Sequence, residues 1–196
     1  MTHIMLNVVL FGAPGCGKGT QAQLLRERFG LNHISTGEVI RGEIARGSRL
    51  GMQMKSYIDR GELAPDSLVI DIIVDYLDSH RDAAGNIFDG FPRTTAQAEA
   101  FDRLLAERGE AVTTMVCMEV PEEELVRRIL LRGRDSGRAD DASEDVIRNR
   151  IRVYNEQTAI VADHYSAQGK YRAVDGIGTI AEITDRIAAA VEEARR

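Results

Sequence analysis

Short apolar runs alternate with longer amphipathic stretches along this chain of 196 residues. The runs cover residues 4–11, 33–35, 86–89, 112–120 and 171–174 and are rich in β-branched side chains. Their apolar character is continuous, which predicts strands that are covered on both faces. Strands that alternate with helices pair in parallel through right-handed crossovers. The pattern therefore predicts a doubly wound α/β fold, in which helices flank a parallel five-stranded sheet and a ligand site lies at the carboxyl ends of the strands.

Two segments interrupt this alternation. Residues 36–66 contain two helical stretches separated by glycines, and residues 133–142 form a short polar stretch, GRDSGRADDA. Both segments are predicted to leave the core and to move, with an ordinary surface connection as the alternative for each.

Residues 12–20, GAPGCGKGT, follow the first apolar run directly. Glycines allow a tight turn whose backbone N–H groups approach an anion, and the helix that starts near Gly17 directs the positive end of its dipole there. Lys18 adds a full positive charge. The segment predicts a phosphate-binding loop, with a glycine turn and an incidental lysine as the alternative. Gly19 follows Lys18 where the general pattern has a hydroxyl residue, so a direct bond from Thr20 to Mg²⁺ is not assumed.

The run at residues 86–89 ends in Asp89, and Arg93 follows at the same edge of the predicted sheet. A carboxylate beside a phosphate loop is placed to hold Mg²⁺, directly or through water. A planar guanidinium suits bidentate contact with phosphate. The alternatives are a turn that ends the strand and a surface arginine.

Three further segments match helix-start patterns. Capping-box spacing occurs twice, at Ser35 with Glu38 and at Thr94 with Gln97. As an alternative role, Arg41 or Gln97 could face a ligand. Asp141 with Glu144 predicts a helix start near residue 141. On that helix one buried face is predicted, formed by Ile147, Ile151, Tyr154, Thr158, Val161 and Tyr165. Arg150 lies close to this face, unlike Arg148 and Arg152.

Composition narrows the class of protein. The net charge of −6 argues against broad binding to nucleic acid or to an anionic membrane surface. No apolar run reaches the ~20 residues of a membrane span, and no signal-peptide pattern precedes the first strand. Two cysteines outside any C-x-x-C motif predict neither a disulfide framework nor a zinc site, and indicate the cytoplasm. His33 is interpreted as a packing or surface residue, and a monomer is the default.

Taken together, GAPGCGKGT, ISTGE with Arg41, IFDGFPRT with Gln97, the LRGR and GRADD segments and VDG at residues 174–176 resemble the adenylate kinases. The resemblance runs from about Val8 to near the C-terminus. It implies a reversible transfer of the γ-phosphoryl group of ATP to AMP, giving two ADP, in a single P-loop kinase domain over residues 1–196. Residues 35–64 would form the NMP-binding segment and residues 132–142 a short lid.

The resemblance also implies a role for each matching residue. The ATP phosphates would contact Gly15, Cys16, Gly17, Lys18, Gly19 and Thr20, and the ATP base would contact Arg128 and Gly178. AMP would contact Thr36, Arg41, Glu62, Leu63, Ala64, Gly90, Phe91, Pro92, Arg93 and Gln97. The transferring phosphoryl group would be surrounded by Lys18, Arg93, Arg132, Arg138 and Arg150, with Arg132 on the ATP side and Arg138 and Arg150 on the AMP side.

Asp89 would hold Mg²⁺ through water, and Asp140 and Asp141 would order its waters or the arginines. Long-lid members carry an extended lid, often with four zinc-binding cysteines, where only five residues separate Arg132 from Arg138 here. Structural zinc is therefore not expected.

Three other classes of function compete with this interpretation. A kinase for UMP and CMP would share the fold and the arginines, although Thr36 and Gln97 favour adenine by resemblance. A non-catalytic adenine-nucleotide sensor would not need the full arginine set. A P-loop GTPase or NTPase switch would need a hydroxyl directly after Lys18.

Overall fold

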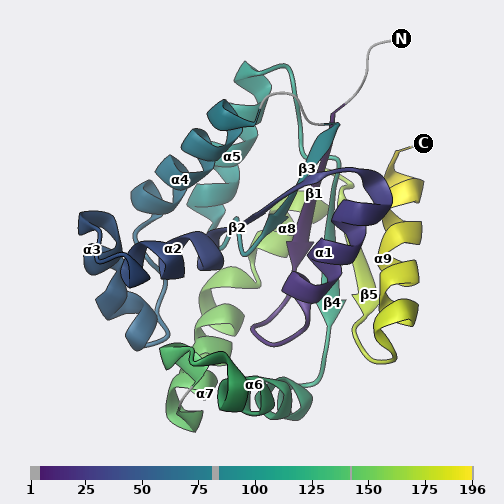
Figure 1. The fold of residues 1–196 in the computed structure, drawn as a ribbon. Helices are drawn as coiled ribbons and strands as arrows, with labels where there is room; N and C mark the ends of the chain where they lie inside the picture. Colours follow the sequence, from purple (N-terminus) through teal and green to yellow (C-terminus); the bar gives the residue numbers. More distant parts are fainter. Residues whose placement is uncertain (1–4, 81–83, 142, 196) are drawn as a thin grey trace.

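A single parallel sheet organises the molecule, whose computed structural model describes residues 5–80, 84–141 and 143–195, without the side chain of Ala139. Its strand order is β2-β3-β1-β4-β5 (Figure 1). The strands are β1 (Leu6–Phe11), β2 (Asn32–Ser35), β3 (Gly85–Asp89), β4 (Thr114–Glu119) and β5 (Tyr171–Asp175). Each ends within one residue of the apolar run that predicts it. The predicted five-stranded parallel sheet is therefore confirmed, with all four pairs parallel.

Helices cover both faces of the sheet. Successive side chains of a strand point to opposite faces, so Val8 and Leu10 enter one core cluster and Val9 and Phe11 the other. The first cluster contains residues of α1 (Lys18–Phe29), α6 (Glu122–Ser136), α7 (Glu144–Val153) and α9 (Ile180–Ala194). The second contains residues of α2 (Thr36–Ala45), α3 (Arg49–Asp59), α4 (Asp66–Ser79), α5 (Thr95–Glu107) and α8 (Val161–Ser166).

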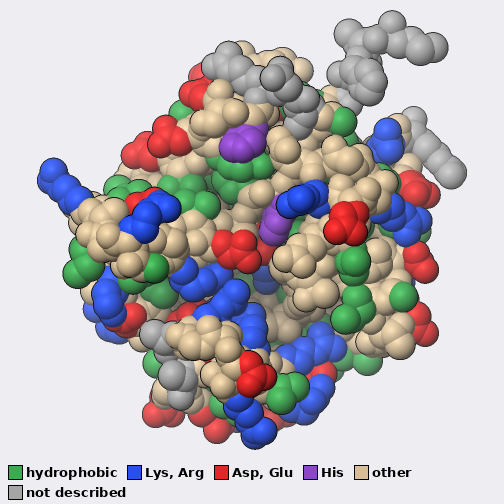
Figure 2. Space-filling model, viewed as in Figure 1, with side chains coloured by type: hydrophobic (Ala, Val, Ile, Leu, Met, Phe, Trp, Pro, Cys, Tyr) green, Lys and Arg blue, Asp and Glu red, His purple; other side chains and the backbone are tan. Residues whose placement is uncertain are grey.

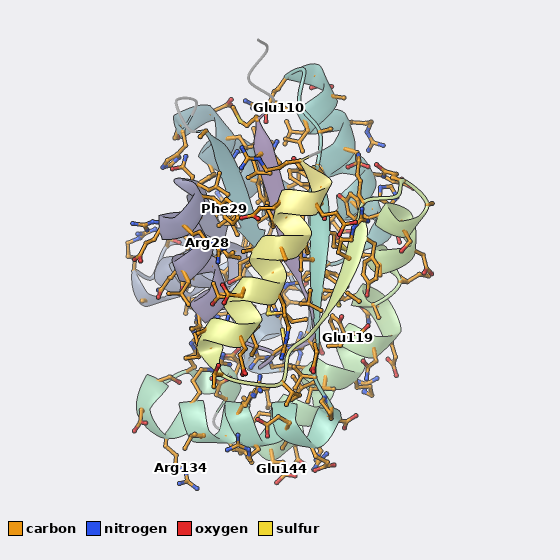
Figure 3. The ribbon with its side chains drawn as sticks, turned by 90° about the vertical axis from the view of Figure 1, so that its right-hand side faces the viewer. Arg28, Phe29, Glu110, Glu119, Arg134 and Glu144 are labelled. Carbon is orange, nitrogen blue, oxygen red and sulfur yellow. The ribbon has the colours of Figure 1, made fainter. Side chains whose placement is uncertain are left out.

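Helix α9 packs beside α1 on the first face, where Arg28 and Phe29 mark the end of α1 (Figure 3). Arg28 Nη1 donates to Asp185 Oδ1 over 2.8 Å and so links the two helices at the surface. Within the described residues, every helix is too short or too polar to cross a bilayer.

Residues 36–66 form the two predicted helical stretches, α2 and α3, followed by the start of α4. The Ser35 hydroxyl accepts from the Glu38 amide, and the Thr94 hydroxyl accepts from the Gln97 amide. Ser35 and Thr94 therefore cap their helices, but the described bonds include only this half of each predicted capping box, and the Gln97 side chain binds the Arg93 amide and Asp66 instead. In the view of Figure 1, α2 and α3 lie to the left of the sheet, and α6 and α7 lie below it.

Residues 133–142, which the sequence predicts as a short polar segment that leaves the core, begin as regular helix. Residues 132–136 continue α6, which ends at Gly137 in the left-handed conformation. A 3₁₀ turn, η1 (Ala139–Asp141), follows, and Ala142 lies outside the described residues. Regular α-helix therefore covers residues 132–136, the first part of the predicted short lid.

The predicted helix start at Asp141 is wrong. Helix α7 begins at Glu144, after Ser143 in an extended conformation, and the Ser143 side chain makes no capping bond. Asp141 binds two arginines instead, as described below. The predicted buried face is confirmed except at Tyr154, which is only half-buried. The helix is irregular: η2 (Tyr154–Thr158) is one π-helical turn between α7 and α8. Such turns insert one residue into the helical repeat and often mark functional sites.

Candidate active site

A cavity of about 370 Å³ opens at the carboxyl ends of β1, β2 and β3. Its lining comes from the phosphate loop, α2, the α3–α4 connection, residues 89–93, and the ends of α6 and α7. Figure 2 shows lysine and arginine side chains gathered around a hollow between the α2–α3 and α6–α7 parts of the molecule. An edge where parallel strands end is the expected ligand position in an open α/β sheet.

The phosphate loop connects β1 to α1 and forms one wall of this cavity. Gly17 precedes the helix with φ of 104°, a conformation that side-chain-bearing residues rarely adopt. Lys18 Nζ donates to the carbonyl oxygens of Gly12 and Ala13, at 2.7 and 3.1 Å. The loop's own carbonyls therefore hold the ammonium group over the site, next to the amino end of α1.

Asp89 ends β3 at the floor of the cavity and is 8% exposed. Its Oδ2 lies 3.8 Å from His33 Nε2. Burial raises the pKa of the Asp89 carboxyl, but His33 and Lys18 outweigh it, so this pKa lies below its ordinary value. The interpretation of His33 as a packing or surface residue misses this contact, because the sequence does not reveal that β2 pairs with β3.

The donor set around Asp89 fits a hydrated Mg²⁺. A Cβ added at Gly19 would lie 3.8 Å from Asp89 Oδ2, which places the carboxylate directly behind the loop. Thr20 lines the same cavity. Magnesium sites beside phosphates commonly use one or two carboxylates and keep several waters.

On the α2 side, the carbonyl oxygen of Gly90 accepts from Thr36 Oγ1 at 2.9 Å and from Arg93 Nε at 2.6 Å. Gln97 Oε1 accepts from the Arg93 amide at 2.8 Å, and Gln97 Nε2 donates to Asp66 Oδ1 at 2.7 Å. These bonds fix the guanidinium and the amide at the cavity wall.

Positive charge is concentrated among these side chains. Burial and the neighbouring Arg150 lower the pKa of Arg93, while burial and Arg138 lower the pKa of Arg41. A guanidinium keeps its proton at neutral pH, so both shifts reflect cations buried close to one another. A polyanion entering the cavity relieves that repulsion.

Two acidic residues of η1 hold the arginines of α6 and α7. Asp141 accepts from Arg132 Nε and Nη2 at 2.7 and 2.8 Å, and from Arg150 Nη1 at 2.7 Å. Asp140 Oδ2 lies 3.1 Å from Arg150 Nη1. Burial raises the pKa of Asp141, but Arg132 and Arg150 outweigh it and the pKa lies below its ordinary value.

The part of the chain that carries the phosphate loop, the carboxylate and the convergent arginines matches a protein-family model. The model described as adenylate kinase matches residues 10–170 of the chain. The chain belongs to the adenylate kinase family. It is 54% identical to the adenylate kinase of Phocaeicola vulgatus and 52% identical to that of Bacteroides thetaiotaomicron, each over 96% of this chain and all of the relative. It is 47% identical to the adenylate kinase of Maricaulis maris, again over 96% of this chain and all of the relative.

Most residues matched to the adenylate kinase pattern meet in the one cavity. Its lining includes every residue predicted to contact AMP, namely Thr36, Arg41, Glu62, Leu63, Ala64, Gly90, Phe91, Pro92, Arg93, Gln97, Arg138 and Arg150. It also includes Gly15, Gly17, Lys18, Gly19, Thr20 and Arg132 of the predicted ATP set. The role of each residue stays a prediction.

Three residues of the predicted ATP set lie off the cavity wall: Cys16, Arg128 and Gly178. The Cys16 side chain is buried in the core cluster beneath the loop. Arg128 Nη1 and Nη2 donate to the carbonyl oxygens of Cys16 and Gly176, at 3.4 and 3.1 Å. The Arg128 guanidinium therefore joins the phosphate loop to the turn after β5, the turn that contains Gly178.

Sequence reasoning missed the apolar part of the lining. Ile40, Ile58, Val69, Val153 and Tyr154 line the cavity beside the polar set. Their helical spacing marks them as buried, but the sequence does not say whether such a residue faces the core or a cavity. These side chains provide the dry surface against which a flat base could pack.

Proposed function

We propose that the chain catalyses reversible transfer of the γ-phosphoryl group of ATP to AMP, giving two ADP. The observation that carries the proposal is the convergence of Lys18, Arg93, Arg132, Arg138 and Arg150 on one cavity at the strand ends. Two nucleotide polyanions repel each other, and several fixed cations at their meeting point offset that repulsion. A site that binds a single nucleotide does not need this many fixed cations.

In the proposed ATP half, backbone N–H groups of residues 15–20 bind the β- and γ-phosphates at the start of α1. Lys18 exchanges its bonds to the loop carbonyls for bonds to phosphate oxygens. Arg128 lies along the ATP base, next to backbone at Gly178. Its existing bonds to Cys16 and Gly176 place its guanidinium on that side of the loop.

In the proposed AMP half, Arg41 and Arg93 bind the phosphate and Gln97 reads the adenine edge. Thr36 and the backbone of residues 62–64 and 90–92 complete this pocket. The Asp66 carboxylate and the Arg93 amide hold the side chain of Gln97 in one orientation. A pre-oriented amide presents one donor and one acceptor, which match the donor–acceptor edge of adenine. The preference for adenine over a pyrimidine is what the resemblance to adenylate kinases implies.

Asp89 would hold Mg²⁺ through water, and the ion would neutralise phosphate charge when bound with ATP. The low pKa of Asp89 keeps this carboxylate ionised at neutral pH. His33 Nε2 lies 3.8 Å from the carboxylate, which is beyond hydrogen-bond distance.

The transfer needs no general base from the protein. A phosphate monoester has a second pKa near ~6, so the AMP phosphate is mostly dianionic at neutral pH. One of its oxygens forms a bond to the γ-phosphorus, the bond from that phosphorus to the β–γ bridging oxygen breaks, and ADP leaves. The arginines and Lys18 stay charged and orient the equatorial oxygens throughout.

Water has to be excluded, since otherwise ATP would be hydrolysed. We assign closure over AMP to residues 35–64 and closure over ATP to residues 132–142, within one P-loop kinase domain. Asp140 and Asp141 keep Arg132 and Arg150 aimed at the reacting groups as these segments move. A monomer in the cytoplasm, without nucleic-acid or membrane partners, completes the proposal.

A product assay tests the function directly. The enzyme is incubated with Mg·ATP and, in separate reactions, AMP, UMP, CMP, GMP or dTMP. We expect ADP with AMP alone, and ATP plus AMP from ADP in the reverse direction. Transfer to UMP or CMP would assign the chain to the pyrimidine branch instead. Binding of ATP without transfer to any acceptor would favour a nucleotide sensor.

A further inference from the structure

A second cavity, of about 310 Å³, lies beyond the active site at the carboxyl ends of β1 and β4, where Tyr171 at the start of β5 also lines it. Its walls come from β1, β4, the start of α6, and the α7–η2–α8 segment. The apolar part is formed by Phe11, Ala13, Met118, Val120, Leu125, Ile151, Ala159 and Ala162. This volume is at the lower end of the range of small-molecule sites.

The two cavities share a wall. Phe11 and Tyr154 line both, and their ring centroids are 5.7 Å apart. The helical segment that carries Tyr154 alternates between the cavities: Val153 and Thr158 face the active site, whereas Ile151 and Asn155 face the second cavity. Ile151 and Val153 belong to α7, and Asn155 and Thr158 belong to η2, so the division runs along both. A molecule in the second cavity therefore touches the back of the active-site wall.

The polar lining of the second cavity consists of uncharged side chains and two carboxylates. Burial raises the pKa of Cys117, Tyr154 and Tyr171, so all three are uncharged at neutral pH. Glu119 and Glu122 are the charged residues of the lining. Figure 3 shows Glu119 at the end of the sheet, near the light green helices.

Glu119 can accept a cation. Among the described residues, no arginine, lysine or histidine lies within ion-pair distance of Glu119, whereas Glu122 lies 3.6 Å from Arg148 Nη1. The negative potential of both carboxylates repels nucleotides and other phosphates. Aromatic faces from Phe11, Tyr154 and Tyr171 suit a flat body or a cation near its edge.

We propose that this second cavity binds a compact aromatic amine, with the ring among Phe11, Tyr154 and Tyr171 and the ammonium group at Glu119. Through the shared Phe11–Tyr154 wall, the bound amine changes nucleotide affinity in the active site. The coupling, but not the binding, rests on the proposed kinase function.

Three indoles of similar shape test the binding: tryptamine, the neutral alcohol tryptophol and the anion indole-3-acetate. Backbone amide shifts are followed by NMR. Tryptamine is expected to shift amides of residues 118–122 and 155–162 with a millimolar dissociation constant or tighter. Tryptophol should bind at least threefold more weakly, and indole-3-acetate more weakly still. Shifts centred on Thr36 and Gln97, or complete displacement by AMP, would overturn the assignment.

Matched variants identify the residues. Ala162→Leu fills the cavity and should weaken tryptamine binding at least tenfold, whereas Ala167→Leu, at an exposed position beside α8, should not. Glu119→Gln should reduce tryptamine affinity to that of tryptophol, while Glu123→Gln leaves it unchanged. Ala159→Met provides a second filling variant if the spectrum of Ala162→Leu loses its dispersion. Unchanged affinity in both filling variants would disprove the site.

Calorimetry of AMP binding tests the coupling. Saturating tryptamine should change the AMP dissociation constant at least twofold and reach a plateau, and by reciprocity AMP should change tryptamine affinity equally. Ala162→Leu should abolish the change. An unaltered AMP constant would refute the coupling alone. Failure of AMP to bind without tryptamine would instead count against the proposed function.

Discussion

Arg148 and Arg150 are two residues apart on α7 but lie in different surroundings. The Arg148 side chain is 44% exposed and pairs with Glu144, one turn earlier on the same helix. The Arg150 side chain is 17% exposed, and Asp140 and Asp141 hold it at the cavity wall. Substitutions at Arg150 and at Arg148 therefore separate the loss of a charge in the active site from the loss of a charge elsewhere on α7.

Arg150→Ala is expected to lower kcat by about 10³-fold or more, because a guanidinium that meets charge in the transition state contributes on that scale. Arg148→Ala should change kcat less than twofold. Steady-state kinetics with saturating ATP and AMP measure both variants, and circular dichroism checks their folding. A folded Arg150→Ala enzyme with near-normal turnover would remove Arg150 from its proposed role.

Asp141 is expected to stabilise the fold as well as orient the arginines. Asp141→Asn should lower the free energy of unfolding by about 1–3 kcal/mol at pH 7, because the three charge-assisted bonds from Arg132 and Arg150 lose their acceptor charge. The native pKa lies below the ordinary 3.8, so the stabilisation is complete above that pH and lost as the pH falls through the native pKa. Urea unfolding measured from pH 7 downwards should show a constant difference between variant and parent near neutral pH, and a difference that shrinks as the pH falls below 3.8. Asp135→Asn, exposed near the end of α6, is the control, and a difference independent of pH would contradict the ion-pair explanation.

At the scale of elements, the end of α3 touches α7. A Cβ added at Gly61 would lie 2.6 Å from Arg150 Cγ, and Asn149 Nδ2 donates to the Arg60 carbonyl oxygen. Gly47 has a similar left-handed φ, 64° against 70°, but no atom lies within 4 Å of an added Cβ. The two glycines therefore share a backbone conformation and differ in their contacts.

Gly61→Ala should raise the KM for AMP at least fivefold, because the added methyl group separates the α2–α3 segment from Arg150. Gly47→Ala should leave that KM within twofold. Both substitutions strain the backbone by about 1–2 kcal/mol. Gly61→Ala adds the close contact with Arg150, so its Tm should fall at least as far as that of Gly47→Ala. Equal KM values would show that the α3–α7 contact does not serve AMP binding.

Strands and the phosphate loop could be predicted from the sequence because their signals are local. An aspartate three positions before a glutamate has the spacing of a helix cap, so the sequence predicts a helix start at Asp141. The same spacing occurs when the aspartate instead binds arginines of α6 and α7, and the sequence does not distinguish the two cases. The π-helical turn was missed because one extra residue hardly disturbs an apolar face read over several turns. The contact between His33 and Asp89, and the positions of Cys16, Arg128 and Gly178 off the cavity wall, depend on strand order and loop packing, which no local pattern encodes.

The whole molecule is acidic, with 31 acidic against 25 basic residues, yet its main cavity is lined by arginines and a lysine from four separate parts of the chain. Binding of both nucleotides should therefore draw together the α1, α2–α3 and α6–α7 regions. An Mg·ATP analogue and AMP, each present at about 100 times its own dissociation constant, should each raise the free energy of unfolding by about 2.7 kcal/mol.

For a chain of this length, a stabilisation of that size corresponds to about 5–11 °C in Tm for one nucleotide. Differential scanning calorimetry with a non-hydrolysable ATP analogue, with AMP and with both checks this. The shift for both together should equal or exceed the sum of the single shifts. A combined shift no larger than that of one nucleotide would mean that the two compete for one site.

Strand order also decides when the protein can fold during synthesis. The central strand, β1, is made first, yet Leu6 pairs with Gly85, 79 positions later, and Val8 with Thr114, 106 positions later. At about 5–20 residues per second, β1 waits roughly 4–16 s for its first partner and longer for its second. Throughout that interval LNVVLF, the six-residue sequence of the innermost strand, emerges from the ribosome with both edges unpaired. Nascent chains are thus most exposed to aggregation before β4 emerges, and that is when a chaperone that shields apolar segments has the most effect.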